Sequence, residues 1–292
     1  MLVVAALGGN ALLRRGEPPE ITRQVANIRT AARALAEIAR EHALVVTHGN
    51  GPQVGLLALR SGDPLYMLSA ETEGMIGYMI ETALRNELPA RDIAGLLTQI
   101  AVDPDDPAFA APGKPIGPIY DEAQARRLAS EHGWTIAPDG DGYRHVVPSP
   151  RPLRILEIET IKLLVQSGIL VICAGGGGIP VIECETGWRG MEAVIDKDHA
   201  SALLARELGA DALLMLTDVD AVFADWDGAK ASPLGAVSTD DLHEHDFAPG
   251  SMGPKVEAAI DFAEATGHMA GIGRLQDAAA ILRGEAGTRV TA

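Results

Sequence analysis

Hydrophobic residues follow two distinct patterns in the first fifty residues. Leu2 to Leu7 forms an uninterrupted apolar run, and residues 21–40 carry apolar side chains at spacings of three and four. A second apolar run covers residues 43–47. Continuous short runs are typical of buried strands, whereas the three- and four-residue spacing is typical of an amphipathic helix. These residues therefore predict a strand–helix–strand unit.

The same alternation continues to the end of the chain. Further helices are predicted at residues 70–88, 122–132, 157–166, 198–208, 254–265 and 278–282. Further strands are predicted near 96–102, 169–174, 212–216 and 269–272 and at the end of the chain, with hairpins around 139–142 and after 174. Strands that alternate with helices predict an α/β fold with a mainly parallel central sheet covered by helices on both faces.

One stretch interrupts this alternation. Residues 103–152 hold nine of the eighteen prolines, in "DPDDPAFAAPGKPIGP" and "VVPSPRP". Proline is unsuited to helix interiors and central strands. We therefore interpret this stretch as a small subdomain or lid inserted into the connectivity of the sheet.

Composition narrows the class of protein. The 292 residues are 47% hydrophobic and 22% charged with a net charge of −16, which indicates a globular chain and argues against nucleic acid as a partner. No apolar run approaches the roughly 18–20 residues that span a bilayer, and no basic segment precedes the first strand. We therefore expect a soluble cytoplasmic protein, in which Cys173 and Cys184 are small buried hydrophobic residues.

Glycine-rich loops follow three predicted strands. These loops are Gly8-Gly9-Asn10, residues 48–52 and residues 175–178. None of them completes a P-loop or dinucleotide-binding fingerprint. Glycine permits positive φ and lets backbone amides approach an anion closely, although each loop could equally be a tight turn. Three such loops at carboxyl ends of strands favour a ligand site, because ligands bind at that edge of parallel sheets.

Lysine is rare in this chain, and three of the five lysines stand in unusual places. Lys255 follows Pro254 in the first turn of a predicted helix, where a cation opposes the helix dipole unless an anion binds there. Lys197 lies directly before another helix, and Lys114 lies in a proline-rich loop of the insert. A mobile, compact lysine charge suits a phosphoryl group that is being transferred.

Aspartates flank Lys197 on both sides. Asp198 is predicted to cap the following helix, to orient neighbouring lysines, or both, and Asp196 is an equal candidate for orienting them. Among the histidines, His48 is predicted to be a hydrogen-bonded structural residue, and residues 243–245 a solvated turn. No histidine stands in a metal-binding pattern, so we assign no metal site to side chains.

Taken together, these stretches resemble the carbamate kinases of the amino acid kinase family. The matching segments are "ALGGNA" (6–11), "HGNGPQVG" (48–55), "IGY" (76–78), "LTQIAVDPDDPAF" (97–109), "GKPIGP" (113–118), "VVPSPRP" (146–152), "GGGGIPV" (175–181), "VIDKD" (194–198), "LTDVDAV" (216–222) and "FAPGSMGPK" (247–255). They span most of the chain in order.

The resemblance implies an open αβα sandwich with two lobes. Residues 1–174, including the insert, form the carbamate-binding lobe, and residues 175–292 form the nucleotide-binding lobe. It also implies a homodimer, whereas the expectation of no membrane and no nucleic-acid partner comes from the hydropathy and the net charge given above. The implied reaction is ATP + carbamate ⇌ ADP + carbamoyl phosphate with Mg²⁺ held mainly by the nucleotide phosphates, and the implied direction is ATP formation in arginine breakdown.

The resemblance also implies roles for individual residues. The catalytic residues are Lys114, Lys197, Asp198 and Lys255. Substrate would lie against Gly8, Gly9, Asn10, Gly49, Asn50, Gly51, Gly175 and Gly176. The nucleotide would lie against Lys197, Thr217, Asp218, Met252 and Lys255.

Two alternatives remain at this stage. The chain is compatible with an amino acid kinase that acts on another carboxylate, such as acetylglutamate, or on a phosphate such as UMP. It is also compatible with a catalytically silent ligand sensor on the same fold, although the four charged residues named above argue for transfer chemistry.

Overall fold

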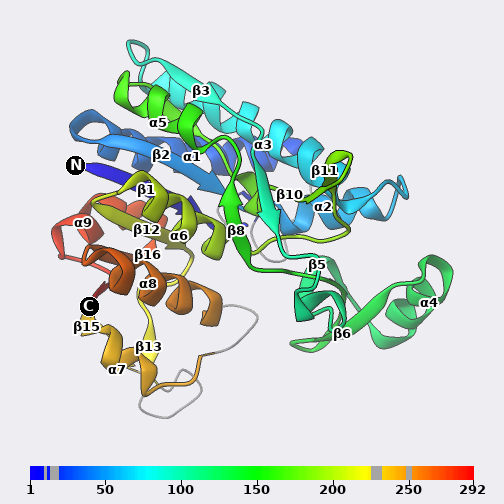
Figure 1. The fold of residues 1–292 in the computed structure, drawn as a ribbon. Helices are drawn as coiled ribbons and strands as arrows, with labels where there is room; N and C mark the ends of the chain where they lie inside the picture. The colour runs from blue at the N-terminus through cyan, green and yellow to red at the C-terminus, as the bar shows by residue number, and fades with distance from the viewer. Residues whose placement is uncertain (10–11, 14–19, 225–231, 248–251) are drawn as a thin grey trace.

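The computed structural model describes residues 1–9, 12–13, 20–224, 232–247 and 252–292 (Figure 1). In these residues the main sheet has eight strands. Across the sheet they are β15 (Ala236–Ser238), β17 (Thr288–Thr291), β16 (Met269–Arg274), β12 (Ala212–Thr217), β1 (Leu2–Leu7), β2 (Ala43–His48), β9 (Leu170–Ile172) and β3 (Ile93–Gly95). Only the β16–β17 pairing is antiparallel, so the predicted mainly parallel sheet is confirmed.

Helices cover both faces of this sheet, as predicted. One face packs against α1 (Ile21–Glu41), α3 (Leu65–Glu87) and α9 (Ala278–Arg283). The other face packs against α5 (Ile158–Gln166), α6 (Lys197–Leu208) and α8 (Gly253–Thr266). Strand β1 shows why its sequence is apolar throughout: alternate residues such as Val3 and Val4 enter opposite cores, and both are fully buried.

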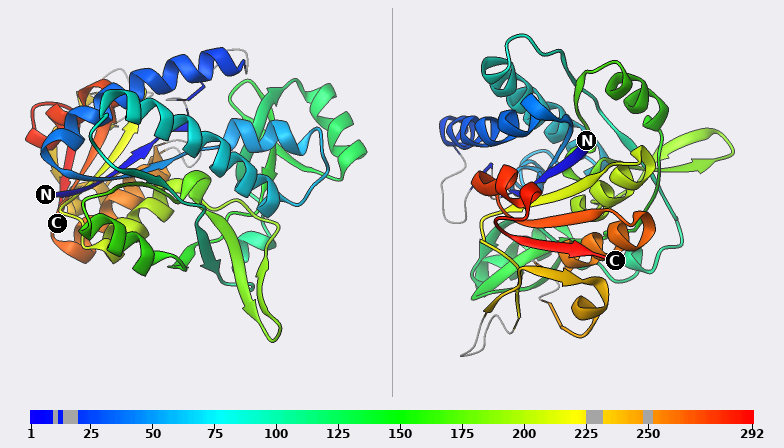
Figure 2. Two further views of the ribbon diagram at one scale, coloured as in Figure 1. Left: turned by 90° about the horizontal axis from the view of Figure 1, so that it is seen from above. Right: turned by 90° about the vertical axis from the view of Figure 1, so that its left-hand side faces the viewer.

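A second sheet extends the molecule beside the main one. Its order is β11 (Gly187–Gly190), β10 (Ile179–Cys184), β4 (Gln99–Val102) and β8 (Pro152–Ile155). Strands β10 and β11 form the hairpin predicted after residue 174, which projects away from the main sheet (Figure 2). Cys184 lies on this hairpin and is exposed, so the prediction that it is buried was wrong, whereas Cys173 is buried.

The proline-rich insert forms a subdomain between β4 and β8. It contains a short 3-10 turn at Pro107–Phe109, helix α4 (Glu122–His132) and a three-stranded sheet. The order of that sheet is β5 (Lys114–Tyr120), β7 (Gly142–Val147) and β6 (Thr135–Asp139). Figures 1 and 2 show this subdomain at one end of the molecule. Lys114 therefore begins a strand and is not in a loop; β5 is an edge strand, where proline is tolerated.

The insert packs on helix α2 (Gly51–Ala58), which was not predicted. Ile116 and Val147 of the insert share a small apolar core with Val54 of α2. The backbones approach so closely that a Cβ atom on Gly55 would lie 2.1 Å from the Cα of Gly117. Only glycine at this crossing allows the two segments to meet without displacement.

Several element boundaries differ from the predictions. Helix α3 begins at Leu65, five residues early, because the Leu65 amide donates to the Glu192 carboxylate at 3.1 Å and so receives a cap from a distant residue. Residues 239–243 form a short helix, α7 (Thr239–His243), which was not predicted and has a capping box made by Ser238 and Asp241. The chain turns in an exposed position directly after it, at Glu244 and His245, close to the predicted solvated turn. Two-residue strands β13 (Phe223–Ala224) and β14 (Ser232–Pro233) pair with each other. Among the described helices, none is both long and apolar enough to cross a membrane.

Candidate active site

The three unusual lysines meet in one cluster, although they come from three separate elements. Lys114 begins β5, Lys197 begins α6, and Lys255 lies in the first turn of α8. Lys114 pairs with Asp196, and Lys197 pairs with Asp198. Lys255 Nζ lies 3.2 Å from the second oxygen of Asp198. The structure thus brings together all four residues that were predicted to be catalytic.

The sequence did not decide which of Asp196 and Asp198 caps the helix and which orients the lysines, and the structure gives the two aspartates different contacts. Asp196 is the N-cap of α6, since its carboxylate accepts from the Asp198 amide at 2.8 Å, and it also pairs with Lys114. Asp198 bridges Lys197 and Lys255. The prediction that Asp198 caps the helix was therefore wrong, whereas its contact with both helix-start lysines agrees with the orienting role.

Burial makes the charges in this cluster strongly interdependent. Burial opposes ionisation of both aspartates, but the lysines outweigh it and hold the pKa of Asp196 and of Asp198 below the ordinary range. Burial lowers the pKa of Lys197, and Lys255 adds to this effect. For Lys255, burial is outweighed by Asp198, Asp196 and then Asp218, so its pKa is raised. Three ammonium groups converge in a buried region, and such a region favours an anionic ligand.

The loops after β1 and β2 lie directly against this cluster. The Gly8 amide donates to Leu216 O at 2.9 Å, and the Gly49 amide donates to Leu7 O at 3.0 Å. A Cβ atom on Gly49 would lie 3.1 Å from the Gly9 amide nitrogen and 3.5 Å from Lys197 Cδ. The two glycine loops and Lys197 are therefore neighbours. Gly51 begins α2, and Asn10 lies outside the described residues.

The four-glycine loop closes the same region from the side of β9. Gly176 has φ +68°, and a Cβ atom there would lie 2.1 Å from the Asn50 side chain. Gly177 and Gly178 also have positive φ, and a Cβ atom on them would clash with Ile195 and Ile100, respectively. This loop therefore needs glycine both for its backbone conformation and for its close packing on Asn50.

The residues predicted to bind nucleotide lie at the end of β12 and the start of α8. Thr217 ends β12, and its hydroxyl donates to Asp218 at 3.1 Å. Met252 directly precedes α8 and packs against the core on that face. Asp218 is close enough to Lys255 to raise its pKa, which links this group to the charge cluster.

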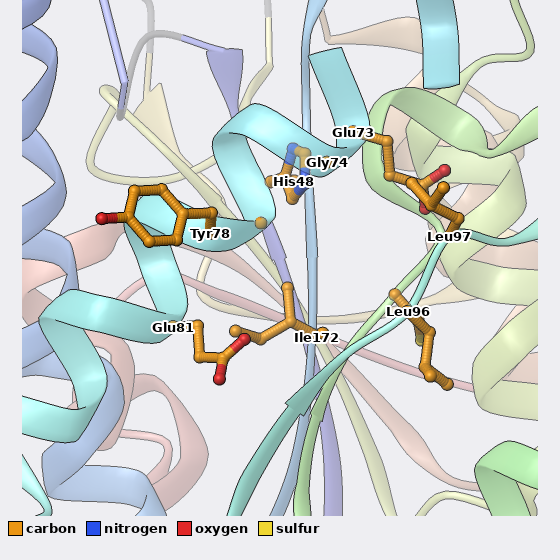
Figure 3. Close-up of a pocket in the computed structure, with 11 residues that line it drawn as sticks. His48, Glu73, Gly74, Tyr78, Glu81, Leu96, Leu97 and Ile172 are labelled. Carbon is orange, nitrogen blue, oxygen red and sulfur yellow. The ribbon is translucent and has the colours of Figure 1, made fainter. Parts of the chain in front are cut away.

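A buried layer behind the glycine loops was missed by the sequence reasoning. His48 Nδ1 hydrogen-bonds Gly49 O at 3.2 Å, as a structural histidine would, but within the described part of the chain its Nε2 has no hydrogen-bond partner. Glu73 of α3 accepts from the Gly175 amide at 2.8 Å. Both line a pocket of about 150 Å³ beside Tyr78 and Leu97 (Figure 3). The sequence signal that could have identified this layer is Glu73 itself, an acidic residue at a core-facing position of a predicted helix.

Burial shifts the pKa values of these two residues in opposite directions. It raises the pKa of Glu73 to about 8, against hydrogen bonds from Thr98 and Gly175 that favour the carboxylate. It lowers the pKa of His48 to about 4, against the hydrogen bond to the backbone of Gly49, which favours the charged imidazole. At neutral pH Glu73 is therefore mainly protonated and His48 is neutral. Within the described ranges, no group of three or more His, Cys, Asp or Glu residues could hold a metal ion.

Comparisons with known proteins show which family this chain belongs to. The model of the amino acid kinase family matches residues 1–272. The carbamate kinase of Haemophilus influenzae is 53% identical over 300 residues, which cover 100% of this chain and 97% of that protein. The carbamate kinase of Rhizobium meliloti is 50% identical over 302 residues, which cover 100% of this chain and 93% of that protein.

Solved structures show the same similarity in three dimensions. Carbamate kinase from Giardia lamblia bound to citric acid matches with a TM-score of 0.94 and 40% identity, covering 99% of this chain and 98% of that one. The same enzyme bound to AMP-PNP matches with a TM-score of 0.89, 39% identity and the same coverage. The predicted fold is thereby confirmed. The chain therefore belongs to the amino acid kinase family and, within it, to the carbamate kinases, which are phosphotransferases.

Proposed function

We propose that this chain catalyses ATP + carbamate ⇌ ADP + carbamoyl phosphate. The observation that carries the proposal is the cluster in which Lys114, Lys197 and Lys255 converge around two buried aspartates. Full-length similarity to enzymes named carbamate kinase supports the choice of acceptor. The intact cluster argues against a silent sensor, because a binding protein needs none of this transfer machinery.

The chemistry of carbamate fits a site of this kind. Carbamate is already an oxyanion, so the reaction requires no general base to generate the nucleophile. The barrier lies in bringing an anion to a polyphosphate and stabilising the charge that is transferred. Lysines and backbone amides in a buried site lower that barrier by positioning the reactants and neutralising their charge.

We assign the two sides of the cluster to the two substrates. Gly8, Gly9 and Asn10, then Gly49, Asn50 and Gly51, and finally Gly175 and Gly176 would contact carbamate and the phosphoryl group. Thr217, Asp218, Met252, Lys197 and Lys255 would contact the nucleotide. Residues 1–174 with their insert then form the carbamate lobe, and residues 175–292 form the nucleotide lobe.

Magnesium fits this site as a partner of the nucleotide. Asp196 and Asp198 already accept from lysines or a backbone amide, so their oxygens are engaged. The nucleotide phosphates would then supply most of the oxygen ligands, as is common for an ion that keeps several waters. When bound, the ion neutralises phosphate charge, while Lys197 and Lys255 hold the same phosphates in place.

We further propose a homodimer formed through the outer face of α3. Met67, Met75 and Tyr78 are exposed on this helix, Tyr78 to 69%, and Leu97 lies beside them. Several exposed apolar side chains on one helix favour burial against a second copy. Light scattering should give a dimer mass for the chain and a monomer mass for Tyr78→Asp, with Leu163→Asp on α5 as the exposed control. A monomeric unmodified chain would rule the dimer out.

The decisive experiment measures ATP formation. The protein is mixed with ADP, Mg²⁺ and carbamoyl phosphate, and ATP is read with a coupled luminescent assay. We expect ATP with carbamoyl phosphate, and no ADP formation when ATP is offered with acetylglutamate or UMP. Absence of ATP would reject the reaction, and tight ADP binding without turnover would instead favour a sensor. We place the enzyme in the cytoplasm and in arginine breakdown, where the ATP-forming direction predominates.

A further inference from the structure

The four-glycine loop adopts a backbone conformation that requires support. Ala174, at its start, has φ +50° and is the non-glycine residue with positive φ in the described part of the chain. Gly176, Gly177 and Gly178 follow with φ +68°, +93° and +79°. Left-handed backbone at alanine is unfavourable and persists where the surroundings impose it.

Two buried side chains from elsewhere in the sequence impose it. Thr98 Oγ1 accepts from the Ala174 amide at 2.8 Å, and Glu73 Oε1 accepts from the Gly175 amide at 2.8 Å. The second oxygen of Glu73 accepts from the Thr98 amide at 3.3 Å. Thr98 is fully buried and Glu73 is 2% exposed, so water does not replace these bonds.

The opposite side of the same loop contacts the substrate side of the proposed site. Gly176 packs on the Asn50 side chain, which is fixed by donating to Thr72 Oγ1 at 2.9 Å. Asn50 directly follows Gly49, and a Cβ atom on Gly49 would lie 3.5 Å from Lys197 Cδ. A displacement of the loop would therefore be transmitted through Asn50 to the carbamate side of the cluster.

Burying an ionisable group such as Glu73 costs free energy, so stability alone does not explain a glutamate at this position. A glutamine of the same size would avoid burying an ionisable group, but its amide offers one acceptor oxygen, whereas Glu73 accepts from two amides. The position of His48 adds a steric limit, since a Cβ atom on Gly175 would lie 2.2 Å from His48 Nε2 and 2.9 Å from Glu73 Cγ. Figure 3 shows His48 on β2 and Glu73 on α3 lining one pocket.

We infer that Glu73 and Thr98 are positioning residues that fix the four-glycine loop, and through Asn50 the carbamate side of the active site. This inference rests on the proposed function. It concerns residues that contact the loop and not the reacting atoms.

The test separates this role from general stability. Thr98→Val keeps size but removes the acceptor for the Ala174 amide, and Thr98→Ser restores it. We expect Thr98→Val to raise KM for carbamoyl phosphate at least about tenfold, consistent with one unsatisfied buried amide, with KM for ADP within about twofold of the unmodified enzyme. Thr98→Ser should recover most of the loss. Glu73→Gln should change KM in the same direction and serves if Thr98→Val does not fold.

A control variant and two contrary results define the outcome of the test. Ser69→Ala removes a buried hydroxyl on α3, one turn before Glu73, that has no hydrogen-bond partner in the described residues, and it should leave both KM values unchanged. Equal rises in both KM values, or a lower melting temperature with unchanged KM for carbamoyl phosphate, would overturn the inference. Inactivity of the unmodified protein in the ATP-forming assay would instead reject the proposed function.

Discussion

Glu73 should make the stability of this protein depend on pH in a window where few side chains titrate. Its pKa is about 8 in the folded protein and 4.5 for an ordinary glutamate. Between these values the folded state holds a proton that the unfolded state has lost. The free energy of unfolding therefore falls as pH rises from 4.5 through 8. Glu73→Gln removes this dependence.

The size of the effect follows from the two pKa values. One bound proton changes the free energy of unfolding by at most about 1.4 kcal/mol per pH unit. His48 acts in the opposite direction, since its pKa falls from 6.5 to about 4 on folding, so its contribution is present above pH 6.5 and is lost as pH falls towards 4. Above pH 6.5 the contribution of His48 to the free energy of unfolding no longer changes with pH, so it no longer offsets that of Glu73. As pH rises from 6.5 to 8, we expect the ionisation of Glu73 in the folded protein to lower the free energy of unfolding by about 1.5–2 kcal/mol.

The assay is denaturant unfolding followed by tryptophan fluorescence at several pH values between 6.5 and 8, at one protein concentration. The quantity of interest is the difference between the unmodified protein and Glu73→Gln, because other titrating groups cancel in it. Glu81→Gln is the control, since Glu81 lines the same pocket but pairs with Arg85 near the surface. A difference that changes by less than about 0.5 kcal/mol over this range would refute the reasoning.

Three further substitutions test the site. Lys255→Ala should lower turnover at least about 100-fold, as loss of a transition-state charge contact does. Near-normal turnover, as expected for the control Lys162→Ala on α5, outside the cluster, would contradict its role. Asp198→Asn leaves two buried ammonium groups without their shared carboxylate and should reduce the free energy of unfolding by about 3–5 kcal/mol in denaturant titration; a loss below about 1 kcal/mol would show that the cluster tolerates it. Gly176→Ala, which combines φ +68° with a clash on Asn50, should cut activity at least about tenfold, whereas Gly62→Ala, with φ +67° and open space, should lose only about 1 kcal/mol of stability; equal effects would show that φ alone matters.

Local signals in the sequence predicted those parts of the fold that local forces determine. The apolar run of β1, the three- and four-residue spacing of α1, and α4, which matches its predicted bounds, depend on neighbours within a few residues. Lys255 and Lys197 were identified by a similar argument, because a cation at a helix start conflicts with the dipole whatever the rest of the fold does. These are short-range effects, and the sequence displays them directly.

The remaining features depend on residues that are distant in the chain. The start of α3 is capped by Glu192, 127 residues away, and Lys114 meets Asp196 across 82 residues. Glu73 supports Gly175 across 102 residues, so its role has no local pattern beyond an acidic group at a core position. Pairings of this kind become visible only when the sheet brings the segments together.

The crossing of Gly55 and Gly117 determines where Lys114 stands. Lys114 lies three residues before Gly117 on β5, and Gly55 lies on the helix that follows the "HGNG" loop. With no side chain between them, the two backbones touch, and the distance from the insert to the main domain is set by main-chain thickness. No side chain that could change its rotamer therefore separates the insert from α2 at this crossing. An alanine at Gly55 would therefore push β5 away from α2, and this displacement would move Lys114 away from Asp196.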